Sequence, residues 1–109
     1  MTVRTELGKI KSIEFGSGGY DGAMTGLSVE LGGQGWGVND FKGTWSTRSE
    51  HAKWTEADQA EIWVETVKLI RDLCEKAKVK NLSGLHGKPV EVTFEGNLLK
   101  SWRILEEVL

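Results

Sequence analysis

The chain has 109 residues, of which 39% are apolar and 28% are charged, and its formal net charge is −2. These values are typical of one globular domain over residues 1–109, and they exclude a wholly disordered chain. They also disfavour a protein that binds nucleic-acid duplexes, because such proteins carry a basic excess. The sequence shows no apolar run long enough for a signal peptide or a membrane span. We therefore expect a cytoplasmic protein with no membrane partner.

Three strands are predicted in the first half of the chain. The first covers residues 9–15, and the second covers residues 25–31, where apolar and polar residues alternate. The third covers residues 36–41. Glycine-rich turns separate the three segments, which favours an antiparallel meander of neighbouring strands. Residues 43–53 follow no period and are predicted to form a loop.

One long helix is predicted after Thr55, whose hydroxyl can cap the first turn while Asp58 serves as the acid of a capping box. Apolar residues then recur at steps of three and four, which predicts a single apolar stripe facing the sheet. The expected stripe contains Ala60, Trp63, Val64, Val67, Ile70, Cys74 and Ala77, widened by Ile62, Leu69 and Leu73.

A C-terminal hairpin is predicted after Pro89, with its turn at residues 95–97. In its second strand we expect Leu98, Trp102 and Ile104 to share one face. The complete order is β-β-β-α-β-β. This order indicates an α+β fold, in which an antiparallel sheet carries one long amphipathic helix on one face.

The chain carries no recognisable catalytic motif, so we expect a binding protein and not an enzyme. The two histidines, His51 and His86, lack metal-ligand spacing from each other and from Cys74. Cys74 falls on the apolar stripe, where a buried and inert thiol is favoured over a nucleophile. We therefore expect neither a metal site nor a cofactor.

Glycine is unusually frequent, with 14 residues in the chain, and ten of these lie between Gly16 and Gly43. The glycine-rich loops do not match the known phosphate-binding motifs, and hairpin turns are the favoured explanation. Ten glycines nevertheless exceed what turns require. The alternative is that some of them allow the close approach of a ligand or of a second subunit.

Five tryptophans supply a large aromatic surface for a chain of this length. Trp63 and Trp102 lie at periodic positions and are expected in the core. Trp36, Trp45 and Trp54 lie in or beside irregular segments. Two interpretations stay open for these three: they cover the sheet edge, or they form a stacking surface for a planar ligand or a subunit contact.

Three stretches resemble small proteins encoded by phages and prophages. They read IKSIEFGSGGYDGAMTGLSVELGGQGWGVNDFKGTW, HAKWTEAD and GKPVEVTFEGNLLKSWRILEEVL. Small phage proteins of this type often counter bacterial immunity. One such class, which includes the Thoeris anti-defence family, consists of oligomeric sponges that sequester cyclic nucleotide or cyclic ADP-ribose signals. The resemblance implies a viral protein of the host cytoplasm, a homo-oligomer that binds a nucleotide-derived signalling molecule without cleaving it.

A sponge of this kind would combine backbone amides, aromatic rings and arginines around its ligand. The residues expected to do so are Gly18, Gly19, Tyr20, Trp36, Phe41, Trp45, Arg48 and Arg103. The alternative is a protein–protein inhibitor of a host defence complex, similar to an anti-CRISPR protein. Its slight acidity would help it to meet a basic surface by electrostatic steering.

Overall fold

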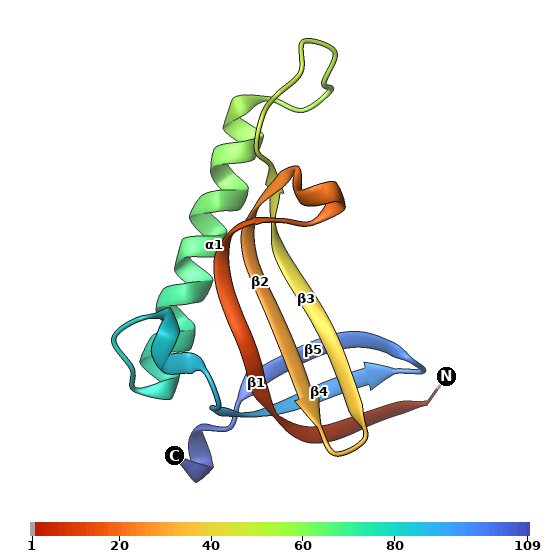
Figure 1. Ribbon diagram of the computed structural model, residues 1–109, viewed down its shortest axis with the longest axis vertical. Coiled ribbons are helices and arrows are strands. Elements are labelled where there is room, and N and C mark those ends of the chain that lie inside the picture. Colours follow the sequence, from red (N-terminus) through yellow and green to blue (C-terminus); the bar gives the residue numbers. More distant parts are fainter. Residues whose placement is uncertain (1) are drawn as a thin grey trace.

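The computed structural model describes residues 2–109 and contains one five-stranded sheet and one long helix (Figure 1). The elements are β1 (Val3–Gly18), β2 (Met24–Gly33), β3 (Trp36–Trp45), α1 (Glu56–Ala77), β4 (Pro89–Glu95) and β5 (Leu98–Ile104), with short 3₁₀ turns η1 (Tyr20–Gly22), η2 (Leu82–Leu85) and η3 (Glu106–Val108). All neighbouring strands are antiparallel, in the order β3-β2-β1-β4-β5. The predicted α+β class and element order are confirmed. Within residues 2–109, no helix has both the length and the apolar character needed to cross a membrane.

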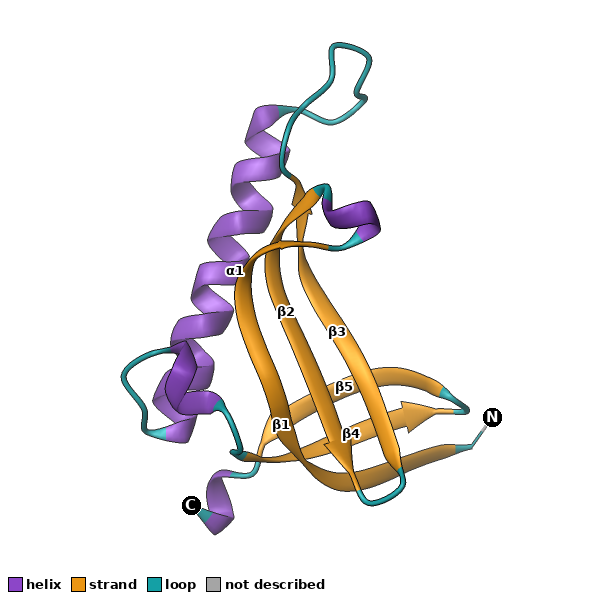
Figure 2. Ribbon diagram, in the orientation of Figure 1, coloured by secondary structure: helices purple, strands orange, loops and turns teal. Residues whose placement is uncertain are grey.

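Strand β1 is much longer than predicted and joins the two halves of the sheet. Residues 3–9 pair with β4, whereas residues 9–18 pair with β2. A register shift between Ile10 and Ser12 marks a bulge, which bends the strand and turns both Ile10 and Ile13 toward the core. As a result, the β4–β5 hairpin runs across the direction of β2 and β3 (Figure 2).

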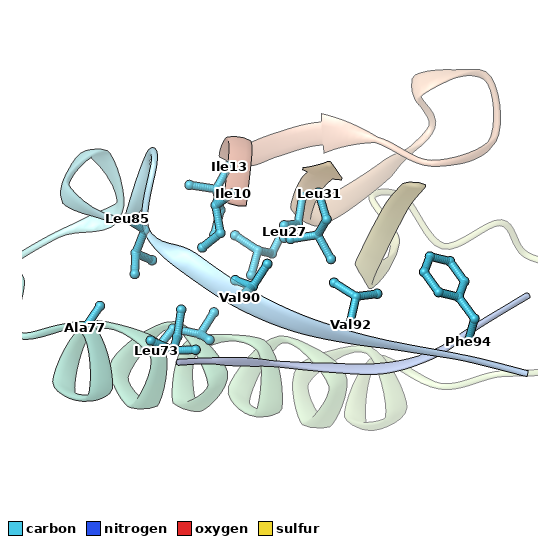
Figure 3. Packing of buried hydrophobic residues seen from close by; sticks show 12 residues of the cluster. Ile10, Ile13, Leu27, Leu31, Leu73, Ala77, Leu85, Val90, Val92 and Phe94 are labelled. Atoms are coloured by element: carbon cyan, nitrogen blue, oxygen red, sulfur yellow. The ribbon is translucent and has the colours of Figure 1, made fainter. Parts of the chain in front are cut away.

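The core lies inside the curl of the sheet and is covered by α1. Figure 3 shows Leu27 and Leu31 on one side, Val90 and Val92 on the other, and Leu73 on the helix beside them. The two edge strands are also linked, because Trp102 Nε1 in β5 donates a hydrogen bond of 2.9 Å to Asp40 Oδ2 in β3. Side chains thus close the curl between strands that do not pair.

Helix α1 is fixed at its start and along one side. Thr55 and Asp58 form the predicted capping box, in which each side chain accepts a hydrogen bond from the other residue's backbone N–H. Trp63 Nε1 donates to the carbonyl oxygen of Thr25 in β2 over 3.0 Å. These contacts place the first half of the helix over β2 and β3.

The side of α1 that faces the sheet differs from the predicted stripe. Leu73 and Thr66 are buried, whereas Val64 and Val67 are 52% and 58% exposed. The exposed members of the predicted stripe are Ala60, Val64 and Val67. Thr66 can be buried because its hydroxyl donates to a carbonyl oxygen one turn earlier, at 2.8 Å. The predicted stripe was therefore wrong by part of a turn.

Two further predictions need correction. Strand β3 continues to Trp45, so the predicted loop begins only after it. In β5, Leu98 is 75% exposed, and Leu99 packs against the core in its place. The cause is a register shift opposite Phe94, which reverses the alternation in this part of the strand.

Three glycines form a row across the first three strands. Gly16 pairs with Gly26, and Gly26 pairs with Gly43. A Cβ on Gly26 would collide with the carbonyl oxygen of Lys42, and a Cβ on Gly43 would lie 2.7 Å from the Cα of Gly26. A Cβ on Gly16 would meet nothing within 4 Å. Within this row, therefore, the close approach of β2 and β3 requires glycine, whereas the approach of β1 and β2 does not.

We expect Gly26→Ala to lower the free energy of unfolding by about 2 kcal/mol, because the added methyl group forces β2 and β3 apart. Gly16→Ala, in the same row, should change it by less than about 0.5 kcal/mol. Urea denaturation followed by tryptophan fluorescence measures both values. Equal effects of the two substitutions would contradict the close approach of β2 and β3.

Candidate functional site

A groove of about 480 Å³ lies on the open face of β1, β2 and β3, opposite the core. The side chains that line it come from two rows across the sheet. The first row is Glu14, Ser28 and Phe41, and the second is Ser12, Glu30 and Asn39. The row of Gly16, Gly26 and Gly43 borders the groove on one side, and Gly32 and Gly37 border it on the other. The ring of Phe41 lies over Gly43 and the side chain of Lys11 lies over Gly32, so side chains from neighbouring positions flank the polar rows.

Phe41 forms an apolar wall of this groove. A Cβ on Gly18 would lie 3.0 Å from Phe41 Cε1, and a Cβ on Gly43 would lie 2.9 Å from Phe41 Cε2. The ring therefore lies over these two glycines, in space that ordinary side chains would fill. Gly19, with a φ of 66°, turns the chain at the end of the groove.

The groove is acidic, and Asp40, which also lines it, is the carboxylate that accepts the hydrogen bond of Trp102. In the described part of the chain, neither Glu14 nor Glu30 forms an ion pair. No lysine or arginine lines the groove. The basic side chain of Lys11 lies with Glu30 beside an adjoining depression. Ser28 and Asn39 add oxygen atoms that accept hydrogen bonds, so the groove suits a positively charged donor.

Five of the eight predicted site residues gather at one end of the sheet. They are Gly18, Gly19, Tyr20, Phe41 and Trp45. Tyr20 and Trp45 pack edge to face, with ring centroids 6.3 Å apart, and Tyr20 is 72% exposed. The hairpin between β1 and β2 contains Gly18, Gly19 and Tyr20, and the pairing of β2 with β3 adds Phe41 and Trp45. An aromatic surface next to the groove results.

Trp36 lies apart from this cluster, at the opposite end of β3. Its ring packs against the core and meets Phe94 edge to face, with 5.6 Å between centroids. The absence of side chains at Gly8 and Gly33 makes room for it, since a Cβ there would lie 2.7 Å from Cζ2 and 2.5 Å from Nε1. Of the two interpretations of Trp36, the structure supports a role in covering the sheet.

Arg48 is held by its own loop. Its Nε donates to the carbonyl oxygen of Trp54 at 2.7 Å, and its Nη2 donates to that of Ala52 at 3.3 Å. The guanidinium also lies 6.0 Å from the centre of the Trp54 ring. The side chain thus stabilises the segment between β3 and α1, and part of its donor set is already used.

Arg103 lies on β5, at the opposite edge of the sheet from β3, and is held by two carboxylates. It donates to Glu107 at 2.9 and 3.1 Å and to Glu91 at 3.2 Å. The hydrogen bond with Glu107 raises the pKa of Arg103 most, and the bond with Glu91 adds to it. The bond between Arg103 and Glu107 also lowers the pKa of Glu107 to about 2. The structure therefore does not bring Arg103 to the other predicted site residues.

Sequence reasoning missed the groove's polar residues. They occupy the polar positions of alternating strands, so the period of two places them on the open face. Only the register of β1, β2 and β3 aligns Glu14 with Ser28 and Phe41. The pattern of a single strand carries no information about that alignment.

The described residues contain neither a metal-binding cluster nor an activated thiol. Among residues 2–109, no three His, Cys, Asp or Glu side chains are grouped to hold a metal ion. Burial raises the pKa of the Cys74 thiol, which keeps it protonated and disfavours nucleophilic attack. Comparison with protein-family models, curated proteins and solved structures finds no match to this chain.

We expect Glu107 to titrate with a pKa of about 2 in the folded protein, measured by NMR of its carboxyl carbon. Arg103→Leu should raise this pKa toward the ordinary value of about 4.3. Because folding favours the ionised form, the stabilisation is present above the ordinary pKa and is lost as the pH falls toward 2. Arg71→Leu, which removes a distant ion pair with Asp72, is the control. An unchanged pKa in the Arg103 variant would mean that Arg103 is free to bind an anion.

Proposed function

We propose that this chain is a non-catalytic binding protein whose groove accepts a positively charged side chain, arginine or lysine, of a partner protein. The observation that carries the proposal is the combination of Glu14, Glu30 and Phe41 in one groove without a basic residue in its lining. A carboxylate forms charge-assisted hydrogen bonds with a guanidinium or an ammonium group. A neighbouring aromatic ring adds cation–π attraction.

The form of the groove supports a protein partner. It lies on an open sheet face, where the exposed side chains of Glu14 and Glu30 are accessible to a side chain of another protein. The net charge of −2 favours encounter with a basic surface. This agrees with the alternative drawn from the resemblance to phage proteins, an inhibitor that docks on a host defence complex.

Sequestration of a nucleotide-derived signal stays a prediction. The exposed pair of Tyr20 and Trp45 favours it, because such rings stack on planar bases. The charges disfavour it, since the carboxylates of the groove repel phosphate. The expected countercharges, Arg48 and Arg103, are held by partners of their own. We therefore place protein docking first.

Titration with a capped hexa-arginine peptide, followed by NMR of the backbone amides, tests the proposal. We expect the largest shifts at Glu14, Ser28, Glu30 and Phe41. Glu30→Gln should weaken binding by about tenfold, because it removes one of two carboxylates that face the bound cation. The affinity should also fall as the salt concentration rises.

Glu61→Gln is the matched control, since it makes the same change of net charge at an exposed position of α1. Equal losses in the Glu30 and Glu61 variants would reduce the interaction to general charge attraction and refute the groove. A rise in melting temperature with cyclic ADP-ribose or a cyclic nucleotide, together with an inert peptide, would favour sequestration instead.

A further inference from the structure

Strand β1 leaves one of its edges unpaired in its second half. Along β1, strand β4 pairs only with residues 3–9. Two hydrogen bonds, of Ile10 with Gly87 and with Lys88, end that ladder. From residue 11 to residue 18, β1 pairs with β2 on one side. No strand of residues 2–109 lies along the other side. Backbone N–H and C=O groups therefore face outward along this edge.

The open edge carries only part of the protection that such edges usually have. Proteins commonly protect exposed edges with prolines, bulges or charged side chains that point inward. The bulge after Ile10 lies at the beginning of this edge, but residues 12–18 contain no proline, and the residues on their core face are Ile13, Phe15 and Ser17. Phe15 is 45% exposed. The edge thus presents an exposed aromatic ring next to unpaired backbone groups.

The exposed apolar flank of α1 lies on the same side of the molecule. Glu65 accepts a hydrogen bond from Lys42 in β3, and Trp63 donates one to Thr25 in β2. The direction around the helix axis from Glu65 to Trp63 therefore runs from β3 toward β1. At 100° per residue, Val67 follows next in that direction. Helix α1 packs on β3 and β2, so its Val67 flank is directed toward the β1 side of the sheet. Two unpartnered surfaces, one backbone and one apolar, thus occupy one side.

The helix flank is hollowed where it meets the segment that follows α1. The depression there has a volume of about 660 Å³. Its apolar lining residues are Val67, Ile70, Cys74, Val79 and Leu82, and its polar ones are Arg71, Glu75, Lys80 and Asn81. The depression therefore gives the apolar side chains of a partner room to bind against this flank of α1.

We propose that residues 11–18 of β1 accept an extended segment of a partner protein as an added strand of the sheet. The unpaired backbone groups would hydrogen-bond its main chain. Its alternate apolar side chains would point inward, toward Phe15 and the flank of α1. The unpaired backbone argues for an extended occupant, because a helix offers no free main-chain donors and acceptors along its length.

Pairing of this edge with the β1 edge of a second copy is the competing arrangement, and the state of association of the protein distinguishes it from a peptide partner. Ser12 and Glu14 of the same strand line the groove on the open face, whereas Phe15 and Val67, which test the acceptor edge, do not line it.

Selection from a displayed library of random linear peptides of about nine residues tests the acceptor edge. We expect enriched peptides in which apolar and polar residues alternate. Phe15→Asp and Val67→Asp should each weaken their binding by about tenfold or more. Leu98→Asp, at an exposed apolar position on β5, is the matched control and should leave binding unchanged.

The hydrogen bonds of an added strand have a signature that does not depend on variants of the protein. N-methylation of the peptide at every second position should abolish binding, whereas methylation at the intervening positions should be tolerated. No enrichment, enrichment without alternation, or equal effects of the two methylation sets would overturn the proposal. A dimer by light scattering that Phe15→Asp converts to a monomer would assign the edge to a second copy and overturn it as well.

Discussion

The bend of β1 is the constraint on which the rest of the structure depends. Strand β1 pairs with β4 through residues 3–9 and with β2 through residues 9–18, so it joins both halves of the sheet. The bulge after Ile10 lets Ile10 and Ile13 face the same side, which keeps the core continuous across the bend. The same bend carries β4 away from residues 11–18. A continuous core and an open edge are thus two consequences of one backbone irregularity.

The curled sheet explains the need for glycine at these positions better than a ligand does. Gly19, Gly22 and Gly35 have positive φ values and serve the turns that the sequence predicts. Gly26 and Gly43 lie inside strands, where the neighbouring backbone leaves no space for a Cβ. The surplus of glycines over turns is therefore explained at these positions by close approach within the chain itself.

The fold was predictable wherever its signals were local. Alternation located the strands, and Thr55 with Asp58 located the start of the helix. The rotation of α1 was not predictable, because apolar residues cover two adjacent sides of it and only packing selects one. Thr66 illustrates the difficulty: a polar residue occupies the buried side because a carbonyl oxygen within the helix satisfies its hydroxyl. A bulge such as the one in β5 leaves no trace in the period of the sequence, and it reversed Leu98 and Leu99.

The candidate site also has a part that local sequence predicts and a part that depends on residues distant in sequence. Residues 18–20 and their aromatic neighbours were predictable because a hairpin joins segments close in sequence. The state of Arg103 depends on Glu91 and Glu107, which the sequence does not show to be its partners. The charge of the groove depends on register, which aligns Glu14 and Glu30 on one open face. A phosphate on that face would lie near two carboxylates without the expected arginines, whereas a cation would be attracted by both. The register of three strands thus determines which sign of charge this face can bind.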